Sequence, residues 1–147
     1  MKALLKQLTT STTGFSALAL RIPVGIIFMA HGSQKLFGWF GGYGLQGTGQ
    51  WMASIGLEPG VLMAFLAGCG EFFGGLFILL GLLTRPAALV LSLTMIVAIA
   101  SVHIGNGLFM ANNGYEFGLA LLAASASLAF SGAGKVGVDN WLNNKLA

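Results

Sequence analysis

Long runs of apolar residues, separated by short clusters of charged residues, glycine and proline, dominate this sequence. A helix needs about 20 mainly apolar residues to cross the roughly 30 Å of hydrocarbon in a bilayer. The pattern predicts four such helices, at about residues 16–38, 59–82, 86–105 and 115–133. Pro59 supports the start of the second helix, because proline is well tolerated in the first turn.

The composition of the chain indicates whether its surface faces water or lipid. Of its 147 residues, 56% are hydrophobic and only 7% are charged, whereas an ordinary soluble domain is about 25% charged. The sequence therefore predicts an all-α integral membrane protein in contact with the lipid bilayer. Its length suits one membrane domain over residues 1–147, folded as a four-helix bundle.

The distribution of basic residues predicts the orientation of the bundle. Four spans place both termini on one side, together with most of the cations: Lys2, Lys6, Arg85, Lys135 and Lys145. The positive-inside rule then predicts cytoplasmic termini, with segment 39–58 outside. Because topology explains the basic excess, we expect no nucleic-acid partner.

Ionisable side chains within the spans are the candidates for function. Counted along the helices, five of them fall between the midplane and the outer surface: His31, Lys35, Glu71, His103 and Glu116. Buried charges persist in a membrane by pairing with one another or by reaching water. We therefore expect these residues to form one hydrogen-bonded cluster that opens outward, while Arg21 lies nearer the cytoplasm.

Small residues indicate which helix faces meet inside the bundle, because they let backbones approach closely. Glu71 is flanked at helical spacing by Ala64, Ala67, Gly68, Gly74 and Gly75. Glu71 should therefore face the bundle, whereas four larger residues should lean toward lipid: Phe65, Phe72, Leu76 and Leu79. Glu116 likewise heads a stripe predicted to face inward: Ala120, Ala123, Ala124, Ser127 and Ser131.

Structural explanations remain open for the polar residues of the outer half. Asn113 and Glu116 have the spacing of a capping-box variant, Lys35 could snorkel to the headgroups, and His103 could cap helix-end carbonyls. Glu71 could form a structural ion pair with Arg21 or Lys35. A carboxylate at mid-membrane nevertheless costs about 2.5 kcal/mol or more, which favours a functional role.

Arg21 and Cys69 have structural explanations of their own. Arg21 could snorkel toward the cytoplasmic headgroups or pair with a carbonyl freed by Pro23. Cys69 is the one cysteine of the chain. An intramolecular disulfide relay is therefore excluded, and we expect Cys69 to serve packing.

Segment 39–58 is rich in glycine and aromatic residues. Trp39, Tyr43 and Trp51 are typical of a membrane interface. Residues 48–55 could form a short amphipathic helix, with Thr48 as its N-cap, that covers the outer mouth as a lid. The alternative is a plain interfacial anchor.

The ordered combination of these features resembles the DoxX family. It comprises Arg21, the stretch "AHGSQKLFG", the glycine-flanked Glu71, an Arg-Pro pair before the third span, and His then Glu around the last loop. The resemblance covers about residues 18–133. It implies a small four-helix protein of bacterial inner membranes, in a setting of redox or quinone-associated membrane assemblies.

Two classes of function follow. In the first, a redox component binds a quinone headgroup: His31 hydrogen-bonds a carbonyl, and Glu71 or Glu116 exchanges the proton. Lys35, His103 and Arg21 complete the predicted ligand-binding set. In the second, the chain is a non-catalytic assembly or binding subunit of a larger oxidoreductase complex, and the small-residue stripes also allow a homo-oligomer.

Haem ligation by His31 and His103 is a narrower option. The small-residue stripes leave little room for a porphyrin, so we do not favour haem. We predict no metal site.

Overall fold

The computed structural model describes residues 2–11 and 14–146 as a set of helices. The main helices are α1 (Lys2–Thr9), α2 (Ser16–Phe37), α3 (Gly44–Ser54), α4 (Gly60–Leu80), α5 (Thr84–Ala98), α6 (Glu116–Ser131) and α7 (Val138–Leu146). Short helical turns lie at Trp39–Gly41, Ile99–His103, Ile104–Asn106 and Met110–Asn112.

Three segments are long and apolar enough to cross a membrane: α2, α4, and Thr84–Asn106, which is α5 with its helical extension. They match the first three predicted spans. The fourth predicted span, 115–133, corresponds to the apolar helix α6 of 16 residues, which is shorter than predicted.

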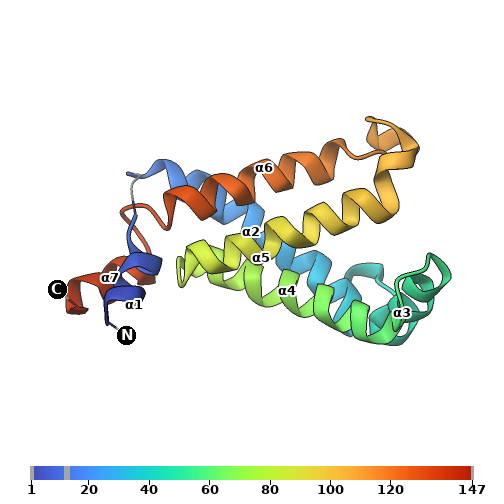
Figure 1. Cartoon of the computed structure of the whole chain (residues 1–147), viewed down its shortest axis with the longest axis horizontal. Helices are drawn as coiled ribbons and strands as arrows, with labels where there is room; N and C mark the ends of the chain where they lie inside the picture. Colours follow the sequence, from blue (N-terminus) through green and yellow to red (C-terminus); the bar gives the residue numbers. More distant parts are fainter. Residues whose placement is uncertain (1, 12–13, 147) are drawn as a thin grey trace.

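The long helices form two pairs (Figure 1). Helix α2 packs along α4, α5 packs along α6, and contacts between α4 and α5 join the pairs. The two pairs lie close together near the termini, where α1 packs against α7, and they diverge toward α3 and the loop before α6. We call these the closed end and the open end. Buried side chains such as Phe28, Ile78, Leu91 and Leu128 form the core between the pairs.

Glycines bring α2 and α4 into close contact. A Cβ atom on Gly25 would lie 2.8 Å from the carbonyl oxygen of Gly75, and one on Gly75 would lie 2.8 Å from that of Gly25. The prediction for the face of α4 is confirmed, because Glu71 is buried together with Ala64, Gly68, Gly74 and Gly75. Ala67 is only half-buried.

The predicted lipid-facing residues of α4 divide into two groups. Phe65 is exposed, as predicted. Phe72, Leu76 and Leu79 are half-buried instead, and Phe72 makes an edge-on ring contact with Phe37 of α2 at 5.6 Å. These three side chains cover the flank of the glycine contact.

The prediction for α6 is wrong. Its buried residues are Leu121, Ser125 and Leu128, whereas the predicted inward stripe is exposed at Ala120, Ala123 and Ser127 and half-buried at Ala124 and Ser131. Helix α6 contacts α5 through leucines that fill the space between the helices, so a close backbone approach is not needed there.

The prediction that Thr48 is an N-cap is also wrong. Helix α3 begins at Gly44, and Thr48 is a buried residue within it. Gly49 explains this placement, because a Cβ atom there would lie 2.7 Å from the side chain of Val61 in α4. The helix is pressed against the first turn of α4 along this buried face.

Candidate functional site

An ion pair links α2 to α4 at the open end. The Nζ atom of Lys35 lies 2.6 Å from Oε2 of Glu71. The side chain of Glu71 is only 4% exposed and that of Lys35 is 22% exposed. Lys35 therefore supplies the partner that the sequence demanded for a buried carboxylate.

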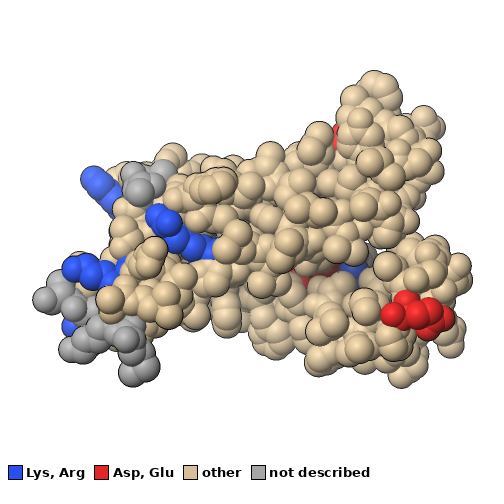
Figure 2. Space-filling model, in the orientation of Figure 1, with Lys and Arg blue, Asp and Glu red and all other residues tan. Residues whose placement is uncertain are grey.

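The pair lines a groove between α4 and α5, which α3 also borders, with a volume of about 720 Å³. Figure 2 shows a hollow between the two helix pairs at the open end, with Lys/Arg and Asp/Glu atoms inside it. The other lining is mostly apolar and includes Met63, Leu66, Val90, Leu93 and Val97. Leu66, Leu93 and Val97 are exposed, so the groove opens along the apolar surface that faces lipid.

Polar side chains of α5 and its extension form the opposite wall of the groove. Thr94, Ser101 and His103 line it together with Asn113 of the following loop. Ser101 and His103 belong to the π-helical turn Ile99–His103, a distortion often found at functional sites. The Nδ1 atom of His103 lies 2.9 Å from the carbonyl oxygen of Asn113, which ties this turn to the loop.

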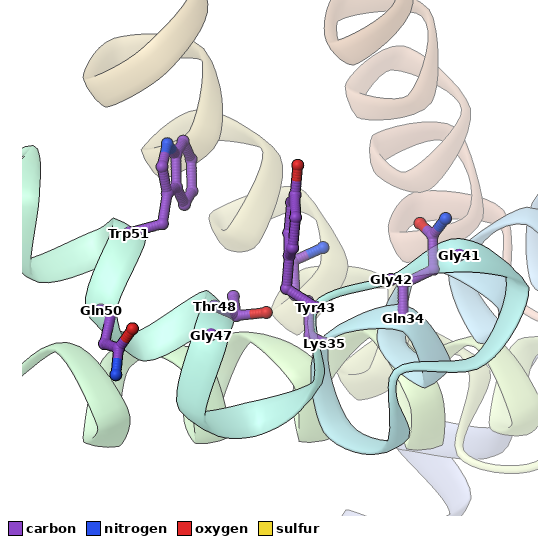
Figure 3. Close-up of a pocket in the computed structure, with 9 residues that line it drawn as sticks. All are labelled: Gln34, Lys35, Gly41, Gly42, Tyr43, Gly47, Thr48, Gln50 and Trp51. Atoms are coloured by element: carbon purple, nitrogen blue, oxygen red, sulfur yellow. The ribbon is translucent and has the colours of Figure 1, made fainter.

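A second pocket of about 670 Å³ lies beside the groove, and Lys35 and Trp51 line both. In Figure 3, the rings of Tyr43 and Trp51 project from the same side of the segment that contains α3. Two of the three predicted lid residues therefore line the cavities. The third, Trp39, lines neither cavity and packs against Phe37 with ring centroids 4.9 Å apart.

His31 and Glu116 lie outside the groove. His31 is exposed, with its ring 6.2 Å from that of Phe117 in α6. The Oε1 atom of Glu116 accepts a hydrogen bond from the backbone N–H of Met110 at 2.6 Å. Among the described residues, the five residues of the predicted cluster therefore make four separate sets of contacts, and only Lys35, Glu71 and His103 share a cavity.

The capping-box alternative for Glu116 is wrong as well. Asn113 has the left-handed backbone conformation, with φ of 58°, and Tyr115 precedes the first helical residue. The carboxylate of Glu116 therefore binds the loop at Met110 and does not form a capping box at the start of its own helix.

Arg21 belongs to the closed end, away from the ligand-binding set in which we placed it. Its side chain is 2% exposed and donates to four carbonyl groups: those of Ile78 at 2.7 Å, Leu79 at 2.9 Å, Ala133 at 2.7 Å, and Val136. These carbonyls lie at the end of α4 and just after α6. Arg21 therefore ties α2 to both helices and has a structural role.

Sequence reasoning missed Asp139 of α7. This carboxylate is 1% exposed and accepts hydrogen bonds from the backbone N–H groups of Leu83 at 2.6 Å and Thr84 at 2.9 Å. It caps the start of α5 from another helix. An acidic residue in a basic, polar segment was the available signal.

Comparison with known proteins identifies the family. The DoxX family model matches residues 16–104. This chain belongs to the DoxX family. It is 37% identical over 122 residues to "Putative oxidoreductase CatD" of Bacillus subtilis (strain 168), covering 83% of each chain.

Two further relatives also match most of this chain. The chain is 36% identical to an uncharacterised protein of Haemophilus influenzae, covering 82% of this chain and 86% of that one. It is 30% identical to an uncharacterised membrane protein of Mycobacterium tuberculosis, covering 88% and 83%. No solved structure matches it significantly. The DoxX protein described here is thus a membrane protein with several apolar helices.

Proposed function

We propose that this DoxX protein is a quinone-associated redox component of the bacterial inner membrane, and that the groove between α4 and α5 holds the quinone headgroup. The observation that carries the proposal is the buried carboxylate of Glu71, paired with Lys35 in a mostly apolar groove of about 720 Å³. A pocket that is apolar apart from a few convergent polar groups is typical of a small-molecule site.

The shape of the groove suits a ligand that arrives from the lipid. Leu66, Leu93 and Val97 are exposed at its rim, where an isoprenoid or alkyl tail would remain in contact with apolar surface. The ammonium group of Lys35 would donate to a ring oxygen, while Glu71 holds that ammonium in place at 2.6 Å. His103, on the opposite wall, is the histidine that lines the groove in place of the predicted His31.

The relative from Bacillus subtilis supports a redox setting, because its name describes an oxidoreductase. Turnover would require an electron-transfer partner, which we place among the membrane oxidoreductases. We propose four crossings with cytoplasmic termini. The packing of α1 against α7 supports this proposal, because termini that share one side need an even number of crossings. Helix α6 would then cross with the three longer segments.

Quinone binding by the purified protein tests the proposal. A decyl-substituted benzoquinone should quench the fluorescence of Trp51, which lines the groove, and the quenching should saturate. Glu71→Gln should weaken this binding at least about tenfold, which corresponds to about 1.4 kcal/mol. The variant should remain folded, because a glutamine can still accept a hydrogen bond from Lys35.

Glu116→Gln is the matched control, since Glu116 does not line the groove. It should bind the quinone as the wild type does. If Glu71→Gln lowers thermal stability and leaves quinone affinity unchanged, the pair serves only to hold α2 and α4 together.

A second candidate function is that of a non-catalytic assembly subunit, also able to self-associate. The exposed small residues of α6, Ala120, Ala123 and Ser127, would let another membrane helix approach closely. Leucine at Ala123 should then abolish co-purification with a membrane oxidoreductase without changing quinone binding.

A further inference from the structure

Two hydroxyl groups in the groove donate their protons to backbone carbonyls. Thr94 Oγ1 donates to the carbonyl of Val90 at 3.0 Å, and Ser101 Oγ donates to that of Val97 at 2.6 Å. Serine and threonine often bond in this way to the carbonyl four residues earlier in a helix. Both residues line the groove, so they present lone pairs to its interior.

His103 adds a third acceptor to the same wall. A carbonyl oxygen can only accept, so the contact of 2.9 Å between Nδ1 and the carbonyl of Asn113 requires the proton on Nδ1. In the neutral ring, Nε2 then carries a lone pair. The α5 wall, formed by Thr94, Ser101 and His103, is therefore a row of hydrogen-bond acceptors.

Two side-chain donors lie across the groove from these acceptors: the ammonium group of Lys35 on α2 and the indole N–H of Trp51 on α3. Beside Lys35, the Oε1 atom of Glu71 accepts no hydrogen bond from the described residues. Asn113, in the loop after α5, also lines the groove, and its amide can donate or accept. A ligand that spans the groove from Lys35 to Thr94 or Ser101 therefore meets a donor at one side and acceptors at the other.

A quinone and its reduced form differ in what they can offer to these two walls. A quinone carbonyl only accepts, so the carbonyl facing the α5 wall would meet lone pairs. A phenolic hydroxyl both donates and accepts. It can donate to Thr94, Ser101 or His103, while the second hydroxyl accepts from Lys35 and donates to Glu71.

We propose that the groove selects the reduced ligand, a 1,4-diphenol with an apolar tail, over the corresponding quinone. This inference rests on the proposed quinone association. It assigns the α5 wall as the surface that distinguishes the two oxidation states.

The test compares three ligands with one ring and one decyl tail: the quinol, the quinone and the dimethyl ether of the quinol. Binding is measured anaerobically by tryptophan quenching and calorimetry. The quinol should bind at least about tenfold more tightly than the quinone. A quinone carbonyl that displaces water from the α5 wall would leave two acceptors facing each other without a donor, which costs about one hydrogen bond or more. The ether, which cannot donate, should bind most weakly.

Equal affinity for quinol and quinone overturns the preference and leaves the quinone site intact. If none of the three ligands binds, the proposed function itself fails, and this inference fails with it. The two failures are therefore distinguishable in one titration series.

Variants then locate the preference on the α5 wall. Thr94→Val and Ser101→Ala should each weaken quinol binding about three- to tenfold, with quinone binding unchanged. Ser92→Ala is the matched control, because its hydroxyl makes the same kind of bond, to the carbonyl of Ala88 at 2.8 Å, outside the groove. A double variant, Thr94→Val with Ser101→Ala, that keeps the full preference overturns the assignment.

Discussion

Each end of the bundle holds a cation inside the protein, Arg21 fully buried and Lys35 partly buried, and the two cations have different partners. At the closed end, Arg21 donates to four backbone carbonyls and lies against no cavity described here. At the open end, Lys35 meets a single carboxylate and lines two cavities. Burial of charge is therefore a poor guide to function in this protein, and the nature of the partner is a better one.

The arrangement of helices explains why the ends differ. Arg21 joins the ends of α4 and α6 to α2, and Asp139 caps α5, so the four long helices converge there. At the open end the pairs diverge (Figure 1), and the space between them becomes the groove. The closed end thus holds the four long helices together, while at the open end polar groups line the groove.

Loss of Arg21 should have the largest effect on stability. Arg21→Met leaves four carbonyls without their donor, and hydrogen bonds to charged groups contribute about 1.5–3 kcal/mol each. We expect a loss of at least about 3 kcal/mol in unfolding free energy and a strongly reduced yield. Thermal unfolding in detergent measures this.

Arg85→Met is the control for that experiment. Its Nε donates to one carbonyl, that of Thr10, at an exposed site, so we expect a loss of about 1 kcal/mol or less. Equal losses for the two variants would contradict the structural role of Arg21.

The glycine contact between α2 and α4 should have the next largest effect. Gly75→Ala places a methyl group 2.8 Å from backbone atoms of Gly25 and Met29, which can move only if the helices part. We expect a loss of about 1–3 kcal/mol in unfolding free energy, with weaker quinone binding, since the Lys35–Glu71 pair spans the same contact.

Gly70→Ala is its matched control on the same helix. There the new methyl group would lie 3.3 Å from the side chain of Val90, which can adjust, and alanine favours a helix by up to about 1 kcal/mol over glycine. We expect little change in stability. Equal sensitivity at Gly70 and Gly75 would mean that α2 and α4 pack less closely than described.

The open end should tolerate loss of its ion pair when both charges are removed together. Lys35→Met alone should cost about 3–5 kcal/mol in unfolding free energy, because it leaves the buried carboxylate of Glu71 unpaired. Glu71→Leu alone should cost less, because the side chain of Lys35 is 22% exposed and its ammonium group can reach water. The double variant should return to within about 1 kcal/mol of the wild type. All three should lose quinone binding, as titration would measure.

Such recovery is not available to Arg21, whose partners are backbone groups. A double variant that stays as unstable as the single variants would make the pair at the open end structural too.

The sequence predicted the long helices and the buried face of α4 correctly, and the buried face of α6 wrongly. The length of the apolar runs predicted the bounds of α2 and α4 to within two residues. In the structure, Gly38 and Gly81 end these helices with φ values of 73° and 68°. Residue counts also predicted the depth of His31 and His103 in the membrane, and this stays a prediction. Depth gives position along the membrane normal, however, and does not say which histidine faces the groove.

Two further features had weak signals in the sequence. The carbonyls that bind Arg21 belong to Ile78, Leu79, Ala133 and Val136, and any residue type can supply a carbonyl. The small residues of α6 suit a helix contact or a lipid-facing surface equally well, so the stripe alone could not define its buried face.

Single cysteines placed at the two ends should have the smallest effect on stability. They test which side of the membrane the open end and the closed end each face. In a Cys69→Ala background, Gln46→Cys marks α3 at the open end and Asn144→Cys marks α7 at the closed end; both positions are exposed. Exposed substitutions of this kind usually change stability by less than about 0.5 kcal/mol. An impermeant thiol reagent should label Gln46→Cys in intact cells and Asn144→Cys only after lysis, because the positive-inside rule places the termini in the cytoplasm. Labelling of both in intact cells would mean that α6, with its 16 residues, does not cross, and the reverse pattern would turn the groove toward the cytoplasm.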